Sequence, residues 1–407
     1  MVYISEALEN RRTRDAMRIV LVSQSYYPRP GGVTEHVHHS ARELRCLGHD
    51  VTIVTANFRT VEPPVPGVVR IGRNVLVPFN GAWVNMTIGA HLPRDLGRVF
   101  DSIEPDVIHT HCPLAPTLPL LTLMTTPRRF RVIGTFHEAA ARNFAYWASK
   151  GFLKRMAQRL DTRIAVSSAA VSLAEKYVRG KYLIIPNGVD CRRFSPDREP
   201  LDHLRDGAFN VLYVGRLDKR KGVKYLFRAV ALVARNTRRP LRLIVVGDDG
   251  VRRRFLPRLP RQVDVHFAGI VDTETLPRYF ATGDVFCSPA VDRESFGIVL
   301  LEAMASGIPV VGTSIPGYLT VLTDRWNALV VPPKDPLAVS RAIMEIMDDP
   351  RLRLTLRENG LRFVERYRWD RIAGRLEQVY ADGRGAGATT FPASEPVPAS
   401  PVQIQKA

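Results

Sequence analysis

The sequence lacks the features of membrane-spanning, exported and disulfide-bonded proteins. Within its 407 residues, no apolar run approaches the roughly 18 residues that a transmembrane helix needs. Residues 1–16 contain neither the apolar stretch nor the small-residue cleavage site of a secretory signal. The four cysteines are far apart and form no Cys-x-x-Cys pair. We therefore expect a cytoplasmic protein in which each cysteine (Cys46, Cys112, Cys191 and Cys287) is a small buried hydrophobic side chain.

Patterns of metal ligands are lacking as well. No Asp-x-Asp sequence is present, and no group of His and Cys residues has the spacing of metal ligands. The sequence predicts that the protein binds no metal and no other cofactor. Fixed cations and helix dipoles must then stabilise any negative charge that its chemistry develops.

Acidic residues are few relative to basic ones. The chain has 58 Lys and Arg against 40 Asp and Glu, which gives a formal net charge of +18. This excess implies attraction to an anionic partner: nucleic acid, an anionic membrane face or a phosphate-bearing ligand. The basic clusters near residues 128–131, 235–239 and 252–254 match no helix-turn-helix, zinc-finger or RNA-recognition pattern, so we expect no nucleic acid. Charge alone does not choose between a membrane and a phosphate ligand.

What is present is a regular alternation of short apolar runs and amphipathic stripes. A strand pattern at residues 18–23, a helical stripe at 33–44 and a strand pattern at 51–55 form one βαβ unit. Further strand patterns follow at 107–109, 132–135 and 164–166, and a second series starts at residue 211. The fold class predicted is α/β, with two Rossmann-like doubly wound domains whose strand ends face one cleft.

The domain boundaries follow from composition. A polar, Pro-bearing stretch separates the two series, and the chain ends in a region rich in Gly, Ala, Pro and Ser. The expected organisation is a disordered extension at 1–16, an N-terminal domain at 17–190, a linker at 191–208, a C-terminal domain at 209–368, a helix at 369–382 that can return to the N-terminal domain, and a disordered tail at 383–407.

The most specific motif contains two glutamates, Glu294 and Glu302, on either side of the predicted start of a helix at Gly297. The free N–H groups of a helix start favour an anion such as phosphate. Carboxylates accept hydrogen bonds from the hydroxyl groups of a sugar or ribose. The full string runs Glu294-Ser295-Phe296-Gly297-Ile298-Val299-Leu300-Leu301-Glu302.

A second motif follows the first strand of the second series. Residues 215–222 read Gly-Arg-Leu-Asp-Lys-Arg-Lys-Gly and place Arg216 and Lys221 at the carboxyl end of that strand. Fixed cations at such a position can neutralise the charge of a departing diphosphate. Lys219 and Arg220 are expected to be solvated.

Two weaker signals lie in the first series. Gly31 and Gly32 follow the first strand, where missing side chains let a ligand approach the backbone of a helix start. A Gly-Gly pair alone is also typical of a plain strand-to-helix turn. His137 ends another strand, although a lone histidine is usually structural.

Taken together, these motifs resemble those of the family 4 retaining glycosyltransferases, enzymes of the GT-B fold, over about residues 17–380. The resemblance implies an N-terminal acceptor domain, a C-terminal nucleotide-sugar-binding domain and a metal-independent transfer with retention of configuration. It implies that Glu294 contacts hydroxyl groups of the donor sugar, that Glu302 contacts the ribose and that His137 hydrogen-bonds near the sugar. The residues implied are catalytic His137, Arg216, Lys221 and Glu294, with donor-binding Gly31, Gly32, Val271, Asp272, Phe296, Gly297, Ile298, Val299 and Glu302.

Within that family the motifs look closest to the phosphatidylinositol α-mannosyltransferases that use GDP-mannose. Residues 78–81 (Pro-Phe-Asn-Gly) resemble their acceptor loop, which implies that Asn80 holds an inositol headgroup at the inner face of the cell membrane. Asn-Gly is equally typical of a simple turn. Asp272 alone does not establish guanine as the donor base.

Three other functions stay open from the sequence. The first is a family 4 transferase that uses a UDP-sugar and a soluble or polysaccharide acceptor. The second is a nucleotide-sugar epimerase of the same architecture. The third is a non-catalytic protein that binds a polyanion or membrane through its charge, with a binding strength that falls steeply with salt.

Overall fold

The computed structural model of the protein describes residues 16–29, 31–58, 65–79, 82–137, 149–247, 259–260, 263–292 and 294–382. Within these residues the chain forms two compact units. The first unit runs to Asn187 and resumes at Trp369, and the second runs from Gly188 to Arg368. Each unit is built of alternating strands and helices, as the sequence predicts.

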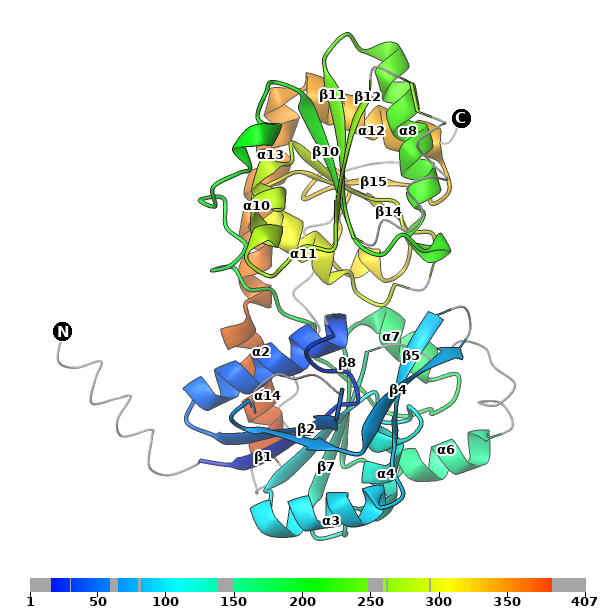
Figure 1. Ribbon diagram of the computed structural model, residues 1–407, viewed down its shortest axis with the longest axis vertical. Helices are drawn as coiled ribbons and strands as arrows, with labels where there is room; N and C mark the ends of the chain where they lie inside the picture. Colours follow the sequence, from blue (N-terminus) through cyan, green and yellow to red (C-terminus); the bar gives the residue numbers. More distant parts are fainter. Residues whose placement is uncertain are drawn as a thin grey trace, which may run out of the picture. The chain divides into compact units, whose positions relative to one another are not determined.

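The first unit contains a parallel sheet of seven strands (Figure 1). All its strand pairs are parallel, so the carboxyl ends of the strands lie at one edge. In spatial order the strands are β3 (Val68–Ile71), β2 (Asp50–Ala56), β1 (Arg18–Val22), β6 (Val107–His111), β7 (Arg131–Phe136), β8 (Thr162–Ala165) and β9 (Leu183–Ile184). The chain reverses its direction across the sheet between β1 and β6, which is the switch point of a doubly wound fold.

Helices cover both faces of this sheet because the side chains of β1 alternate between them. Ile19 and Leu21 pack in the same cluster as α2 and α14, whereas Val20 and Val22 pack with α3 and α4. The helices are α2 (Gly32–Cys46), α3 (Leu92–Ile103), α4 (Leu118–Thr125), α6 (Lys150–Ala157), α7 (Ser168–Ala174) and α14 (Trp369–Ala381), and a separate antiparallel hairpin consists of β4 (Arg73–Phe79) and β5 (Ala82–Ile88).

The C-terminal helix α14 belongs to the first unit, although the whole second unit precedes it in the chain. Trp369, Ile372, Leu376 and Tyr380 are buried in the cluster that contains β1 and α2. Tyr380 also hydrogen-bonds through its hydroxyl group to His109 Nδ1 of β6 at 2.6 Å. The first unit is therefore closed by a segment from the other end of the chain.

The second unit contains a parallel sheet of six strands with the same kind of order (Figure 1). In spatial order these are β12 (Val263–Gly269), β11 (Leu241–Val246), β10 (Phe209–Val214), β13 (Val285–Ser288), β14 (Val310–Thr313) and β15 (Leu329–Val331). Its helices are α8 (Val223–Asn236), α10 (Thr275–Thr282), α11 (Ile298–Ala305), α12 (Pro336–Asp348) and α13 (Pro350–Val364), with short 3-10 helices η1 (Asp202–Leu204), η2 (Lys219–Lys221), η4 (Tyr318–Thr320) and η5 (Glu365–Tyr367). Val211 and Tyr213 of β10 pack with α8 and α12.

The segment predicted as a linker, 191–208, packs onto the second unit. The compact second unit begins at Gly188 and includes this segment. Phe194 packs edge-on against Phe280 of α10 with 5.3 Å between ring centroids, and the Leu201 N–H donates to Thr282 Oγ1 at 2.8 Å. A few buried apolar side chains anchor a segment whose overall composition is polar.

The cysteine prediction is only partly correct. Cys287 on β13 is buried, and burial raises the pKa of its thiol. Cys46, the last residue of α2, is exposed, and Cys112 and Cys191 are partly buried. Cys46 is exposed because it lies off the apolar stripe by which α2 contacts the sheet.

The predicted extension, apart from Ala16, and the predicted tail at 383–407 lie outside the described residues. In the parts of the chain that are described, no helix has the length and apolar character that crossing a bilayer requires.

Candidate functional site

The switch point of the second sheet brings the two most specific motifs together. β10 and β13 are neighbours in the sheet, and the chain leaves them toward opposite sides. The Arg/Lys motif follows β10, and the motif with the two glutamates follows β13. Both loops start at the carboxyl edge of the same parallel sheet, which is where doubly wound folds bind ligands.

Lys221 and Glu294 form an ion pair at this edge. The distance between Lys221 Nζ and Glu294 Oε2 is 3.0 Å, and the two side chains are 16% and 17% exposed. Because water reaches the pair only in part, solvent screens its charges less than those of a surface pair. The result is a cation and a hydroxyl-accepting carboxylate side by side, within reach of a ligand that approaches from solvent.

Close backbone packing fixes Lys221 in this place. Gly222, which follows it, has a φ of 67°, and a Cβ on Gly222 would lie 1.9 Å from the carbonyl oxygen of Pro289. Only glycine permits this approach between the loop after β10 and the loop after β13. The Val291 N–H donates to the Arg220 carbonyl at 2.8 Å and joins the same two loops.

Asp218 organises the short helix that carries Lys221. Its Oδ1 accepts hydrogen bonds from the N–H groups of Arg220 and Lys221, at 2.9 and 3.1 Å. Its Oδ2 lies 3.1 Å from Arg220 Nη2, so Arg220 is ion-paired and not merely solvated. These hydrogen bonds and the arginines lower the pKa of Asp218 despite the opposing effect of its burial.

Arg216 has a fixed backbone and an exposed side chain. The Tyr213 hydroxyl donates to the Arg216 carbonyl at 2.8 Å, while the side chain is 64% exposed. Its Nη2 lies 3.8 Å from Asp218 Oδ2, at the long end of an ion-pair distance. The guanidinium group can therefore change partners when an anion binds.

Helix α11 begins beside Glu294. Gly297 caps it with a φ of 94°, and a Cβ there would meet the ring of Tyr318 at 2.9 Å. A Cβ on Gly317 would lie 1.8 Å from the Glu294 carbonyl oxygen, so the loop that carries Glu294 is packed onto this second glycine. The first N–H groups of α11, those of Ile298 and Val299, have no acceptor within the helix.

The other members of this motif differ in their surroundings. Phe296 is buried within the second unit, and its ring lies edge-on to that of Tyr367 at 5.8 Å between centroids. The ring is therefore a packing group, and only the backbone of Phe296 is left for a donor. Glu302 lies one turn into α11 and is partly buried.

Val271 and Asp272 follow β12, at the outer edge of the sheet. Asp272 Oδ1 accepts from the N–H groups of Glu274 and Thr275, at 2.9 and 2.7 Å, and its Oδ2 accepts from the Thr275 hydroxyl at 2.8 Å. These hydrogen bonds lower the pKa of Asp272 and tie its carboxylate to the start of α10. Asp272 thus stabilises the turn that leads into α10.

The first unit holds its own group of expected site residues at the carboxyl edge of its sheet. Gly31 precedes α2, and a Cβ built on it meets no atom of the described residues within 4 Å. Packing within the described part of the unit therefore does not require a glycine at this position. Asn80, expected to bind the acceptor, lies outside the described residues.

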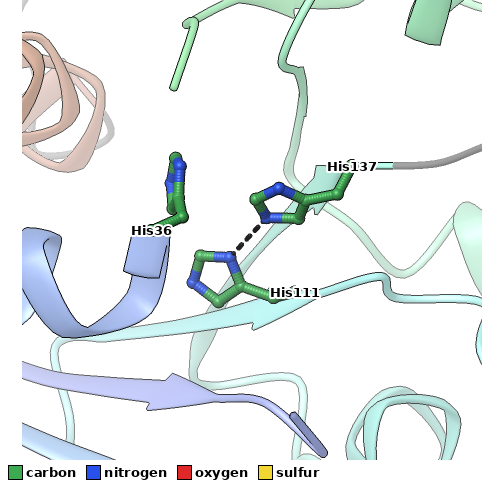
Figure 2. A group of neighbouring side chains, drawn as sticks. All are labelled: His36, His111 and His137. Atoms are coloured by element: carbon green, nitrogen blue, oxygen red, sulfur yellow. Dashed lines mark hydrogen bonds between the residues drawn. The ribbon is translucent and has the colours of Figure 1, made fainter. Parts of the chain in front are cut away.

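His137 lies in a cluster with two histidines that the sequence analysis did not single out. His111 ends β6 and His137 follows β7, the neighbouring strand, while His36 comes from the second turn of α2. Figure 2 shows the three rings turned toward one another, with the hydrogen bond between His111 Nδ1 and His137 Nε2, which is 2.9 Å long. His36 Nδ1 lies 2.8 Å from Asn187 Oδ1.

Burial keeps these imidazoles neutral. It lowers the pKa of His36 to about 4 and that of His109 to about 3, and it lowers the pKa values of His111 and His137 well below the usual range. Each neutral imidazole has one N–H donor and one nitrogen acceptor. The sequence feature that could have indicated this cluster is His109-Thr110-His111, which places two histidines on one face of a strand.

Three histidines could in principle hold a metal ion. One ring nitrogen each from His36, His111 and His137 lie within 4.8 Å of one another. A zinc ion bound at about 2.0–2.1 Å would need nitrogens about 3.4 Å apart, so the group would have to contract around it. In the described part of the chain, the geometry fits direct hydrogen bonding between histidines better than tetrahedral coordination.

Comparison with known proteins identifies the family of the chain. Residues 30–193 match the family model of Glycosyltransferase Family 4, and residues 200–363 match that of Glycosyl transferases group 1. A phosphatidyl-myo-inositol mannosyltransferase of Mycolicibacterium smegmatis is 32% identical over 91% of this chain and 95% of its own length. One of Propionibacterium freudenreichii is 34% identical over 89% of this chain and 94% of its own.

Solved structures share the fold at low sequence identity. A glycosyltransferase from Rickettsia africae superimposes with a TM-score of 0.72 at 17% identity, covering 92% of this chain and all of its own. Anabaena HepE in complex with UDP and glucose has a TM-score of 0.70 at 19% identity, covering 90% of this chain and 99% of its own.

Proposed function

Since the chain belongs to glycosyltransferase family 4 and is therefore a glycosyltransferase, we propose that it transfers mannose from GDP-mannose to a phosphatidylinositol-type lipid with retention of configuration. The observation that carries the proposal is the ion pair of Lys221 and Glu294 beside the start of α11. It combines a group for a diphosphate with a group for sugar hydroxyls. The choice of mannose and of the lipid rests on the activity of the relatives that match nearly the whole chain.

Donor binding uses three kinds of group in the second unit. The N–H groups at the start of α11 donate hydrogen bonds to the phosphate oxygens, Glu294 accepts hydrogen bonds from sugar hydroxyls, and Glu302 accepts them from the ribose. Lys221, already 3.0 Å from Glu294, needs only a small side-chain movement to share its charge with the diphosphate. The exposed side chain of Arg216 supplies the second cation.

The transfer step needs charge stabilisation more than it needs a base. The acceptor hydroxyl oxygen forms a bond to the anomeric carbon as the bond from that carbon to the diphosphate oxygen breaks. The departing phosphate oxygen takes the proton of the acceptor, so atoms and charge balance without an enzymatic nucleophile. Arg216 and Lys221 stabilise the negative charge that grows on the leaving group, and His137 hydrogen-bonds near the sugar.

The proposal includes no metal and no cofactor, and it includes docking of the protein on the inner face of the cell membrane. Arg216 and Lys221 provide the charge compensation that a divalent cation gives other transferases. The net charge of +18 would bring the enzyme to an anionic leaflet, where its lipid acceptor lies. Asn80 is the proposed contact to the inositol headgroup.

The test is a transfer assay with purified full-length protein. Vesicles containing phosphatidylinositol are incubated with radiolabelled GDP-mannose, GDP-glucose, UDP-glucose or ADP-glucose, each in the presence of excess EDTA. We expect label in the lipid fraction from GDP-mannose alone, and an α-anomeric product by NMR. Transfer from a UDP-sugar to a soluble acceptor would replace the proposed substrates. Interconversion of a nucleotide sugar without transfer would indicate an epimerase, and strict dependence on Mg²⁺ or Mn²⁺ would contradict the role given to the two cations.

A further inference from the structure

The contact between His111 and His137 leaves one edge of the His137 ring for a ligand. His111 Nδ1 lies 2.9 Å from His137 Nε2, so this nitrogen of His137 is already in use. Only the Nδ1 edge of His137 remains to contact a substrate. What His137 can do there depends on which of its nitrogens carries the hydrogen.

The surroundings of His111 decide which ring donates. His111 Nε2 is buried, and among the described residues it has no hydrogen-bond partner. If His137 donated, His111 Nδ1 would be the acceptor and the buried, unpaired Nε2 would carry a hydrogen. If His111 donates, its Nε2 is an unpaired acceptor instead. Buried donors without partners are rarer in native proteins than under-used acceptors, which favours donation from His111 to His137.

Neighbouring rings hold His111 in the orientation that this hydrogen bond requires. His109 stacks on His111 with 4.5 Å between centroids and is itself bonded on both sides, to the Tyr380 hydroxyl at 2.6 Å and to Thr135 Oγ1 at 2.7 Å. His36 lies edge-on to His111 and His137, with centroids 5.3 and 4.7 Å away. The imidazole of His111 therefore cannot turn over without disturbing packed neighbours.

The hydrogen bond of His36 to Asn187 fixes the tautomer of His36 as well. Asn187 Oδ1 can only accept, so His36 Nδ1 carries the hydrogen and donates it over 2.8 Å. His36 Nε2 is then a bare acceptor, buried and without a partner among the described residues. The cluster thus places its hydrogens on Nδ1 atoms.

We propose that His111 is a positioning residue that donates its Nδ1–H to His137 Nε2 and so fixes His137 in the tautomer that carries its own hydrogen on Nδ1. The inference rests on the proposed function for its consequence. His137 then presents a neutral N–H donor to an oxygen of the donor substrate. The opposite tautomer would present a lone pair to the same oxygen and repel it as negative charge grows there. A group that holds the wrong tautomer can cost several orders of magnitude in rate even when the geometry is intact.

A matched pair of substitutions separates the two tautomers. Asn and Asp have the same size, but His111→Asn keeps an N–H donor near the position of Nδ1, whereas His111→Asp offers an acceptor there. In full-length protein labelled with ¹⁵N-histidine, long-range ¹H–¹⁵N correlation spectra report which ring nitrogen is protonated. A His137→Gln spectrum assigns the His137 signals.

We expect the wild-type spectrum to show His137 protonated on Nδ1 and unprotonated on Nε2. His111→Asn should keep this pattern and most of the activity. His111→Asp should move the hydrogen to Nε2 and lower kcat on the order of 100-fold, with a smaller change in the KM for the donor. Equal activities of the Asn and Asp variants would overturn the proposal.

The wild-type spectrum decides the question even where a variant does not fold. A hydrogen on His137 Nε2, or zinc bound by these histidines in the purified protein, overturns the proposal whatever the substrate proves to be. Because the spectrum needs no substrate, this result is independent of the transfer assay. Lack of transfer from GDP-mannose would overturn the proposed function and leave the assigned tautomer standing.

Discussion

At the scale of single residues, the proposed function gives Lys221 and Glu294 different parts of one ligand: Lys221 binds the diphosphate and Glu294 binds the sugar hydroxyl groups. Each neutralises the other while the site is empty, and each has a separate partner on a nucleotide sugar. We predict that Lys221→Ala and Arg216→Ala each lower kcat/KM on the order of 100-fold, because one preorganised charge contact to a leaving group contributes a few kcal/mol. Steady-state kinetics with the identified donor measures the loss.

Lys219 provides the matched control for this prediction. It is a lysine of the same short helix η2, and its side chain is exposed. Lys219→Ala should therefore keep most of the wild-type activity. Folded Lys221→Ala and Arg216→Ala variants that turn over like Lys219→Ala would mean that the leaving group binds elsewhere.

The ion pair follows from sequence motifs, but the histidine cluster does not. Lys221 and Glu294 belong to strings with fixed internal spacing, and a doubly wound sheet brings the loops after β10 and β13 to one edge. His36, His111 and His137 come together only because β6 lies between β1 and β7 and because α2 covers one face. No local pattern contains that sheet order, so the partners of His137 were not predictable.

At the scale of elements, the approach of two loops in the second unit depends on glycine. Gly222 has a φ of 67°, and a Cβ on it would lie 1.9 Å from the Pro289 carbonyl oxygen. Gly269 has a φ of 69°, and a Cβ on it would meet no described atom within 4 Å. Both Gly→Ala variants place an alanine in the left-handed backbone region, which lowers the unfolding free energy by about 1–2 kcal/mol. The clash should lower the unfolding free energy of Gly222→Ala by a further ~1–3 kcal/mol.

Denaturant unfolding monitored by hydrogen exchange of the second unit checks this difference. Gly269→Ala serves as the control, because it changes the backbone preference alone. Similar losses of unfolding free energy in the two variants would show that the loops separate at no appreciable cost, and that the position of Lys221 is not fixed by this contact.

Elements with strong periodicity were predictable, and elements defined by tertiary contacts were not. The predicted strand at 18–23 is β1, and the predicted helix at 33–44 is α2, each within about two residues. The hairpin of β4 and β5 was missed, because its strands are only partly buried and their alternation is weak. The contacts of the segment at 191–208 with the second unit were not predictable, because its few anchoring side chains, among them Phe194, are set in a polar sequence.

At the scale of the whole molecule, the buried histidines make the first unit sensitive to acid. An unfolded histidine has a pKa near 6.5, whereas the pKa of buried His36 is about 4. Between these values the unfolded chain binds protons that the folded unit excludes, so stability is complete above about pH 6.5 and is lost as the pH falls toward 4. His109, His111 and His137 act in the same direction.

Hydrogen exchange resolved by peptide tests this pH dependence. We expect exchange in β1, β6 and β7 to accelerate between pH 6.5 and 4.5, after correction for the intrinsic rate, more than exchange in β10 and β13. The second unit has His203 and His266, of which His266 also has a lowered pKa, so its own change should be smaller but not zero. Equal changes in both units would contradict the assignment of acid sensitivity to the histidine cluster.

The net charge of the molecule predicts its behaviour at a lipid surface. In the first unit, Phe152 of α6 is 43% exposed and lies among Arg128, Arg155 and Arg159. An apolar ring within a basic group suits the boundary between headgroups and acyl chains of an anionic leaflet, where each arginine contributes about 1 kcal/mol. We predict that the protein floats with vesicles that contain anionic lipid and not with neutral ones.

The double variant Arg128→Glu/Arg155→Glu should weaken this binding by a factor of roughly 10 or more. The variant Arg238→Glu/Arg351→Glu, which makes the same change in charge in the second unit, should weaken it much less. Equal effects of the two variants would show that net charge alone drives the attraction. No flotation with anionic vesicles would contradict membrane docking, while the assignment to the glycosyltransferases would remain.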